Sequence, residues 1–268
     1  MLNFLHTFQP TPILASIGPI NIYWYGFLIM FGVLAAIGTA VYLAKQLGLK
    51  QEVILDLAVW LIVGGIIGAR LYDIGLEWQY FSIHPLDAFK IWRGGLAIHG
   101  AIIGGAITLW LFAKKYQHNF WQLTAIVATV LPLGQAIGRW GNYFNRELFG
   151  YPTNLPWGIP IDLFHRPWQY LEFTYFHPTF LYESLGSLII FAIMLFLHFK
   201  RVANFELRVT SYLFMYSILR FSTEFVRIDV TPTLFGLRFP QIASLLIMLF
   251  CLGYFIWLKI RKKEPLDN

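Results

Sequence analysis

Long apolar runs separated by short charged segments organise the whole sequence. A transmembrane helix needs about 20 consecutive apolar residues, and seven stretches meet this need by uncharged length and flanking charge. They cover residues 22–44, 53–71, 95–113, 120–138, 180–199, 207–225 and 239–258. The sixth has the weakest signal, because only eleven uncharged residues separate Arg208 from Arg220, so six spans is the alternative count. The pattern predicts an all-α polytopic membrane protein with about seven transmembrane helices.

Basic residues between the apolar stretches predict an orientation. Most of them fall in alternate loops, at Lys45 and Lys50, at Lys114 and Lys115, at Lys200, Arg201 and Arg208, and at Lys259, Arg261, Lys262 and Lys263. Cytoplasmic loops carry an excess of Lys and Arg, so we expect the N-terminus outside and the C-terminus in the cytoplasm. The inner side then holds eleven basic and five acidic residues, and the outer side nine of each. The formal net charge of +6 therefore lies inside and requires no nucleic-acid partner.

Composition agrees with an integral membrane protein. The chain is 57% hydrophobic and only 13% charged, which departs from soluble domains in both respects. Its one cysteine, Cys251, lies in the last apolar run, which excludes a disulfide framework and a thiolate metal site. No Lys or Arg precedes Lys45, so the start lacks the basic region of a cleaved signal peptide, and we expect it to be retained.

The predicted loops suggest one membrane domain over residues 1–268 with two outer elaborations. These cover about residues 72–94 and 140–178, and the second is rich in Pro and aromatic residues, as expected of a small outer head. Glycines four residues apart, such as Gly64 and Gly68 or Gly100 and Gly104, predict close packing between helices.

Arginines at the outer ends of the apolar stretches are the first candidates for chemistry. The expected outer side carries one lysine, Lys90, against Arg70, Arg93, Arg139, Arg146, Arg166, Arg220, Arg227 and Arg238. Arginine binds phosphate and carboxylate bidentately, whereas lysine acts as a point charge. Charge beside hydrocarbon costs several kcal/mol and tends to persist where it functions. The pattern therefore suggests an anionic headgroup as ligand, although topology alone already concentrates lysine inside.

Two further motifs combine charge with helical spacing. Arg220, Glu224 and Arg227 follow i, i+4, i+7 spacing, which places them on one helical face, either as a self-neutralising ion-pair ladder or as a binding site. His99 lies between glycines near the outer end of the third stretch. Such a histidine is either a hydrogen-bonded packing residue or a base with a pKa suited to a thiol.

Two other residues have structural explanations that suffice by themselves. Tyr25 at the start of the first stretch suits an aromatic belt. Glu183, after the motif His177-Pro178-Thr179-Phe180-Leu181-Tyr182, is expected in the first turn of the fifth helix, where the dipole favours an acid. Zinc-ligand spacing, a G-x-S-x-G elbow and a P-loop are absent from the sequence.

Five motifs in order carry a resemblance to a known family. The signature G-R-x-G-N-[FY]-x-N-x-E is met by Gly138, Arg139, Gly141, Asn142, Tyr143, Asn145 and Glu147, with Gly150 following. The other motifs are Trp24-Tyr25-Gly26, His99-Gly100, the His177 to Glu183 segment, and Arg220, Glu224, Arg227 and Asp229. Over about residues 20 to 260 the chain resembles the phosphatidylglycerol:prolipoprotein diacylglyceryl transferases of bacterial inner membranes. The departures are Tyr23, where a basic residue is common, and Tyr143, where phenylalanine is usual.

This resemblance implies an enzyme of bacterial lipoprotein maturation. The expected reaction transfers the diacylglyceryl group of phosphatidylglycerol to the lipobox cysteine of a preprolipoprotein signal peptide, with a thioether and glycerol phosphate as products, at the outer face of the membrane. His99 would be the base, and Arg139 and Arg220 would hold the phosphate. The expected substrate-binding residues are Tyr25, Asn142, Asn145, Glu147, Gly150, Glu224 and Arg227. Membrane lipids are further partners, and no metal or organic cofactor is implied, because the displacement needs neither redox change nor an electron sink.

Two alternatives stay open on the sequence. The arginines could lower the pKa of the substrate thiol enough that no base is needed, in which case His99 only positions substrate. The chain could also be a transporter or binding protein for an anionic solute or lipid headgroup, although transporters usually show internal repeats and midplane charges. No repeat is visible, and the charges lie at the outer ends.

Overall fold

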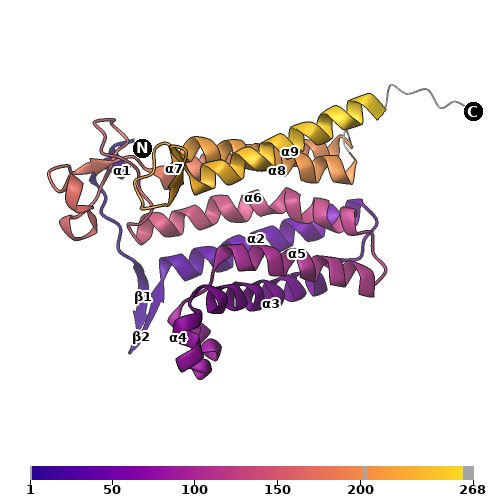
Figure 1. Ribbon diagram of the computed structural model, residues 1–268, viewed down its shortest axis with the longest axis horizontal. Helices are drawn as coiled ribbons and strands as arrows, with labels where there is room; N and C mark the ends of the chain where they lie inside the picture. Colours follow the sequence, from indigo (N-terminus) through magenta and orange to yellow (C-terminus); the bar gives the residue numbers. More distant parts are fainter. Residues whose placement is uncertain (1, 202–203, 262–268) are drawn as a thin grey trace, which may run out of the picture. The chain divides into compact units, whose positions relative to one another are not determined.

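The computed structural model describes residues 2–201 and 204–261, and helices form at all seven predicted stretches. They are α2 (Trp24–Gln46), α3 (Gln51–Leu76), α5 (Ile98–Lys115), α6 (Phe120–Phe144), α7 (Thr179–Phe199), α8 (Phe205–Glu224) and α9 (Phe239–Arg261) (Figure 1). Within the described residues, five of them are long and apolar enough to cross a membrane: α2, α3, α6, α7 and α9. The chain is therefore a mostly helical, multi-pass membrane protein. The count of seven spans stays a prediction, because α5 and α8 are not among the helices that meet this requirement.

Apolar side chains cover the outsides of the candidate spans. On α9, Leu246 is 63% and Phe250 71% exposed. In water such a surface would be costly, whereas acyl chains solvate it as well as another helix would. Exposure of this kind supports a membrane environment.

The described structure divides into two compact units. Unit 1 contains residues 2–36 and 128–261, and unit 2 contains residues 37–127. The boundary falls inside α2 and α6, so both helices contribute to both units. The expectation of a single membrane domain stays a prediction.

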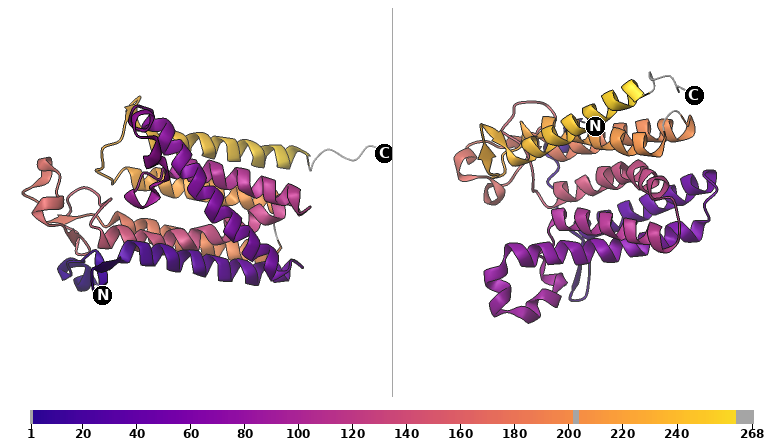
Figure 2. Two further views of the ribbon diagram at one scale, coloured as in Figure 1. Left: turned by 90° about the horizontal axis from the view of Figure 1, so that it is seen from below. Right: turned by 45° about the vertical axis from the view of Figure 1, so that its right-hand side comes forward.

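Glycine-lined contact joins α3 to α5 in unit 2, where the two helices lie side by side (Figures 1 and 2). A Cβ atom at Gly68 would lie 2.8 Å from the Cα of Gly104, closer than real Cβ atoms approach. Only glycine allows this backbone-to-backbone packing, and the packing role predicted for these residues is confirmed.

Arg70 fastens the loop that connects these two helices. This loop contains α4 (Trp78–Ile83), η1 (Pro85–Phe89) and η2 (Ile91–Arg93). The buried guanidinium donates to the carbonyls of Ala88 at 2.8 Å, Gly94 at 2.9 Å and Gly95 at 3.0 Å. Both glycines have positive φ angles, 92° and 74°, a region that disfavours side chains. The apolar run from residue 95 therefore becomes helical only at Ile98, and α3 extends to Leu76, past the predicted loop start at 72.

Unit 1 packs the second half of α6 against α7 and α8. The Ser184 hydroxyl of α7 donates to the Ala136 carbonyl of α6 at 2.9 Å, and α8 packs against both α7 and α9 (Figure 1). Two β-hairpins also belong to this unit, β1 (Ile13–Ile17) with β2 (Ile20–Tyr23) and β5 (Thr233–Leu234) with β6 (Leu237–Arg238).

A small head follows α6 and leads into α7. It contains the two-stranded sheet of β3 (Ile159–Pro160) and β4 (Tyr175–Phe176), with η3 (Leu163–His165) and η4 (Trp168–Tyr170) between them, and α1 (Leu2–Thr7) contacts β3. Its core comprises Leu5, Tyr143, Phe149, Ile159, Ile161, Phe176 and Phe180. The helix α6 continues to Phe144 and contributes Tyr143 to this core, and the outer elaboration expected at about residues 140–178 stays a prediction.

Candidate active site

Four arginines and three carboxylates gather at one end of the unit 1 helices. They are Arg139, Arg220, Arg227 and Arg238 with Glu183, Glu224 and Asp229, and we call them the arginine cluster. The C-terminal ends of α6 and α8 meet the beginnings of α7 and α9 there. The guanidinium groups outnumber the carboxylates by one, so the cluster keeps a formal positive charge beside apolar helices.

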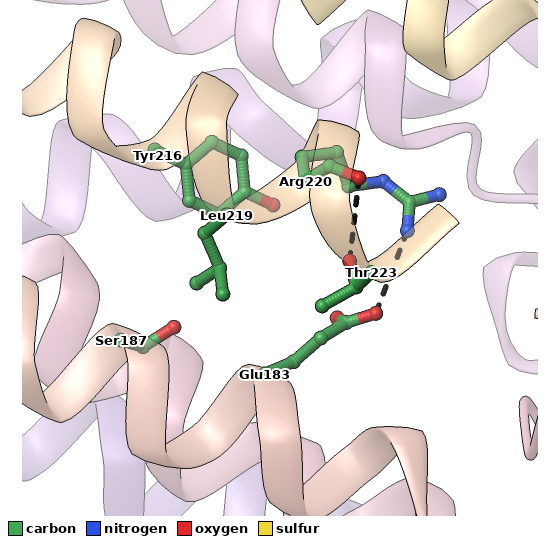
Figure 3. Close-up of a pocket in the computed structure, with 6 residues that line it drawn as sticks. All are labelled: Glu183, Ser187, Tyr216, Leu219, Arg220 and Thr223. Carbon is green, nitrogen blue, oxygen red and sulfur yellow. Dashed lines mark hydrogen bonds and ion pairs between the residues drawn. The ribbon is translucent and has the colours of Figure 1, made fainter. Parts of the chain in front are cut away.

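Glu183 lies at the centre of this cluster. Its Oε2 lies 2.5 Å from Nε of Arg139, and its Oε1 lies 3.4 Å from Nη1 of Arg220 and 3.2 Å from Nη1 of Arg227. Figure 3 shows the contact with Arg220 across the space between α7 and α8. Glu183 is only 4% exposed, and a carboxylate at that depth needs compensating charge. One buried acid thus binds three arginines from different elements.

The sequence assigned Glu183 a simpler role, which is wrong. The helix α7 begins at Thr179, so Glu183 lies in its second turn, beyond the turn where the dipole favours acids. Its actual partners come from α6, α8 and the segment after α8. Contacts of this kind have no signature in local spacing.

Spacing did identify the pair Arg220 and Glu224. Nη2 of Arg220 lies 2.8 Å from Oε2 of Glu224, one helical turn away, and Glu224 is 1% exposed. The helix α8 ends at Glu224, so Arg227 does not lie on this helical face, but the expected ion pair forms, with Nε of Arg227 4.0 Å from Oε2 of Glu224. Arg227 follows the turn, pairs with Gly150 in an isolated β-bridge, and binds Asp229 at 2.7 Å.

Arg238 completes the cluster from the end of β6, just before α9, and the sequence offered no reason to assign it a role. Its Nε lies 3.1 Å from Oε1 of Glu224, and its Nη1 donates to the Arg227 carbonyl at 2.7 Å. Nη2 contacts the Asp229 side chain at 3.3 Å. Burial opposes ionisation of Asp229, but the Arg227 hydrogen bond and the charges of Arg227 and Arg238 outweigh it and lower the pKa of that carboxyl. Asp229 therefore stays ionised between two arginines.

A polar chain leads from Arg139 into the loop after α6. Arg139 Nη1 donates to Oδ1 of Asn142 at 3.5 Å, and Nδ2 of Asn142 donates to Oε1 of Glu147 at 2.7 Å. The backbone N–H of Glu147 donates to the Asn142 carbonyl at 3.0 Å, and this hydrogen bond fixes the loop against the helix. Asn145 lies in this loop, and its backbone N–H donates to the Gly141 carbonyl at 3.0 Å.

Gly141 of the signature and Gly150, which follows it, let other parts of the chain approach their backbones closely. A Cβ at Gly141 would lie 2.7 Å from Cδ2 of Tyr25, so α6 contacts the first turn of α2 there. The Tyr25 hydroxyl lies within range of the charges of Arg139 and Glu147. A Cβ at Gly150 would lie 2.7 Å from the Val226 carbonyl, and its amide donates to His177 O at 2.9 Å. The predicted residue Gly150 thus joins the head to the segment carrying Arg227.

The His177 motif serves the head. The Trp157 indole donates to the Tyr182 hydroxyl at 2.9 Å, which lies 3.0 Å from Nδ1 of His177. With its oxygen accepting from Trp157, Tyr182 can donate its proton to His177. Burial lowers the pKa of His177, and a neutral imidazole is the acceptor that this arrangement requires.

A narrow pocket adjoins the arginine cluster between α7 and α8 (Figure 3). It is lined by Glu183, Ser187, Tyr216, Leu219, Arg220 and Thr223. Ser187 follows Glu183 by one turn of α7, and Tyr216 precedes Arg220 by one turn of α8. The Glu183–Arg220 pair therefore has hydroxyl groups on its inner side.

His99 belongs to unit 2, whereas the other predicted site residues belong to unit 1. It is the second residue of α5, is exposed, and has its ring centroid 5.9 Å from that of Tyr72. The carbonyls of Gly94 and Gly95 that Arg70 binds lie just before it in the chain. Its participation in a site with the arginines stays a prediction.

The eight outer arginines do not form one group. Arg70 binds loop carbonyls in unit 2, and Arg93 pairs with Asp87 at 3.4 Å. Arg146 binds the Pro10 carbonyl and Asp162, and Arg166 binds the Ile161 carbonyl at 2.7 Å. Only the remaining four belong to the cluster. Throughout residues 2–201 and 204–261, no group of His, Cys, Asp or Glu side chains is arranged to hold a metal ion.

The helices and the arginine cluster define a multi-pass membrane protein with a polar, positively charged site at one end of its helices. The family model "Prolipoprotein diacylglyceryl transferase" matches residues 12–257, and the chain belongs to that family. This confirms the resemblance seen in the five sequence motifs.

Curated relatives agree over nearly the full length. A phosphatidylglycerol–prolipoprotein diacylglyceryl transferase of Nostoc sp. is 45% identical, covering 100% of this chain and 95% of the relative. Relatives of the same name from Synechocystis sp. and Gloeobacter violaceus are 41% and 44% identical. They cover 98% and 94% of this chain and 95% and 94% of their own lengths.

Proposed function

We propose that the protein transfers the diacylglyceryl group of phosphatidylglycerol to the cysteine thiol of a prolipoprotein lipobox. The names of its relatives supply the two substrates, and the arginine cluster is the observation that carries the proposal. A lipid phosphate needs cationic, bidentate donors at the level of its headgroup, and Arg139 and Arg220 have that chemistry. The transporter alternative has no support among the named relatives.

The reaction is a displacement at a glycerol carbon. Sulfur attacks that carbon and forms the C–S bond, while the C–O bond to phosphate breaks and its electron pair leaves with the phosphate oxygen. The thiol proton passes to a base, and the products are the thioether and glycerol phosphate. Charge develops on the departing phosphate, so preorganised donors there lower the barrier.

Arg139 and Arg220 are the proposed phosphate clamp. Their side chains are 24% and 20% exposed, enough to face a ligand while most of each guanidinium stays in protein. Glu224 and Arg227 would brace Arg220, given the 2.8 Å pair to Glu224 and the link of both arginines through Glu183. An arginine so held pays little ordering entropy when the phosphate binds.

The neighbouring polar residues would orient the glycerol part of the headgroup. Asn142 and Glu147 are hydrogen-bonded to each other at 2.7 Å, and Glu147 is exposed. Tyr25 would contribute a hydroxyl from α2. Asn145 and Gly150 would act by shaping the loop after α6, since their described contacts are made by the backbone.

His99 is the proposed base, and its replacement separates two mechanisms. General-base catalysis contributes about 10²- to 10⁴-fold, so His99→Gln should lose about that much transfer while phosphatidylglycerol binding stays intact. Transfer at neutral pH within a few-fold of the wild type would instead show that the arginines acidify the thiol and that His99 only positions substrate.

The finer topology is part of the same proposal. We place the site at the outer face of the bacterial inner membrane, with seven spans, the N-terminus outside and the C-terminus in the cytoplasm, in a single membrane domain. The alternation of lysine-rich loops supports this orientation.

The reaction is tested by mass spectrometry of a lipobox peptide incubated with the purified protein in phosphatidylglycerol micelles. A diacylglyceryl adduct should appear on the cysteine peptide and be absent from the matched serine peptide, because a hydroxyl is a far poorer nucleophile here. Failure of the folded protein to modify the cysteine peptide would reject the proposed function.

A further inference from the structure

Glu183 is the one acid of the cluster that contacts both arginines of the proposed clamp, among the residues that the structure describes. Its two carboxylate oxygens form ion pairs with Arg139 at 2.5 Å and with Arg220 at 3.4 Å. A third ion pair joins Glu183 to Arg227 at 3.2 Å. A phosphate held by Arg139 and Arg220 must share these donors with the carboxylate. Glu183 is therefore a competitor of any anion that binds to the clamp.

Substrate and product differ in charge at this position. Phosphatidylglycerol is a phosphodiester with one negative charge, whereas a phosphomonoester carries about 1.5 to 2 negative charges at pH 7. Four arginines without sufficient acid would bind the more highly charged product more tightly than the substrate. A site that turns over must limit that preference.

We propose that Glu183 is an internal counter-anion that promotes release of glycerol phosphate by reclaiming Arg139 and Arg220 after the displacement. The inference rests on the proposed function and assigns Glu183 a positioning role, since it acts through the arginines. Glu224 is less suited to this role, because it pairs with Arg220, Arg227 and Arg238, and none of its described ion pairs reaches Arg139. Arg227 and Arg238 remain bound to Asp229 and keep the cluster in place.

The pocket beside Glu183 places a hydroxyl group next to the carboxylate. Ser187 lines the same narrow space one turn after Glu183 on α7, and the Thr223 hydroxyl across from it donates to the Arg220 carbonyl at 3.3 Å (Figure 3). The Ser187 hydroxyl can donate to a carboxylate that is displaced by phosphate, so the displaced acid would keep a polar neighbour.

The test measures binding of glycerol phosphate to purified protein in uncharged detergent by calorimetry, in parallel with the peptide transfer assay. Glu183→Gln keeps the shape of the side chain and removes its charge. We expect glycerol phosphate to bind about tenfold more tightly, with a smaller change in the affinity for phosphatidylglycerol and a lower kcat. Glu172→Gln, an exposed residue of the head, changes the net charge equally and should bind as the wild type does.

A merely structural role for Glu183 predicts the opposite result. If the acid only holds the arginines in place, Glu183→Gln weakens binding and raises KM, and that outcome overturns the inference. Glu183→Asp, which keeps the charge but has a shorter reach, should give an affinity between those of the wild type and Glu183→Gln. If Glu183→Gln does not fold, Glu183→Asp is tested by itself. A glycerol phosphate affinity of Glu183→Asp at or below that of the wild type then overturns the inference.

The proposed function can fail separately. Wild-type protein that does not modify the cysteine peptide rejects the reaction itself. Wild-type protein that transfers normally, together with unchanged or weaker product binding by Glu183→Gln, rejects only the role of Glu183.

Discussion

Arg70 and Arg220 are both largely shielded from solvent, yet different chemical groups bind them. Arg70 is surrounded mainly by backbone carbonyls, those of Ala88, Gly94 and Gly95 among them, with Asp73 as its acid at 3.3 Å. Arg220 is held by the carboxylates of Glu183 and Glu224. Carbonyls are fixed by the chain and cannot leave without unfolding the loop, whereas a carboxylate can exchange its place with another anion. The partner type therefore separates a structural arginine from one able to bind a ligand.

Of the substitutions that test this difference, Arg220→Lys should change diacylglyceryl transfer the most. Lysine keeps the charge but cannot bind Glu183 and phosphate with two aligned donors, so diacylglyceryl transfer should fall by about 100-fold or more. The same change at Arg93, whose side chain is 61% exposed, should leave transfer within about twofold of the wild type. Transfer by Arg220→Lys within a few-fold of the wild type would refute the clamp.

Arg70→Lys should act chiefly on stability. An ammonium group cannot reach all the carbonyls that the guanidinium binds, and unsatisfied buried groups should lower the free energy of unfolding by about 2–3 kcal/mol. Thermal unfolding in detergent measures this loss, and transfer per folded molecule should fall much less than in Arg220→Lys. A variant with wild-type stability would show that the loop is held by other contacts.

The smallest expected change is in the pH dependence of stability, and it arises from Asp87 in the same loop between α3 and α5. Hydrogen bonds from Lys90 and Tyr80 lower the pKa of Asp87 to about 2, from an ordinary 3.8. A lowered carboxyl pKa stabilises the folded state above about pH 4, and this stabilisation is lost as the pH falls toward 2. The difference in thermal midpoint between the wild type and Asp87→Asn should therefore narrow over that range. A difference independent of pH would exclude this explanation.

Uncharged length and flanking charge located the seven long helices, because a span of about 20 apolar residues has few other stable conformations in a membrane. Helix ends were less accessible. The helix α5 starts at Ile98 because Arg70, 25 residues before Gly95, binds the carbonyls of Gly94 and Gly95. A contact between distant parts of the chain decided that boundary.

The candidate site was predictable where its contacts are local. Arg220 and Glu224 are one turn apart in one helix, and the signature loop brings Asn142 to Glu147. Glu183 and Arg238 contribute from other elements, so spacing did not reveal their partners. Arg227 was misplaced because the end of α8 at Glu224 carries no Gly or Pro signal.

In the proposed reaction, Arg139 holds the lipid phosphate during transfer. The most direct test incubates a lipobox peptide with phosphatidylglycerol micelles and wild-type, Arg139→Ala or Arg93→Ala protein, and measures the peptide mass and the lipid affinity. We expect the adduct with the wild type and Arg93→Ala, and loss of both adduct and lipid affinity with folded Arg139→Ala. Retention of both affinity and turnover by Arg139→Ala would contradict the phosphate clamp.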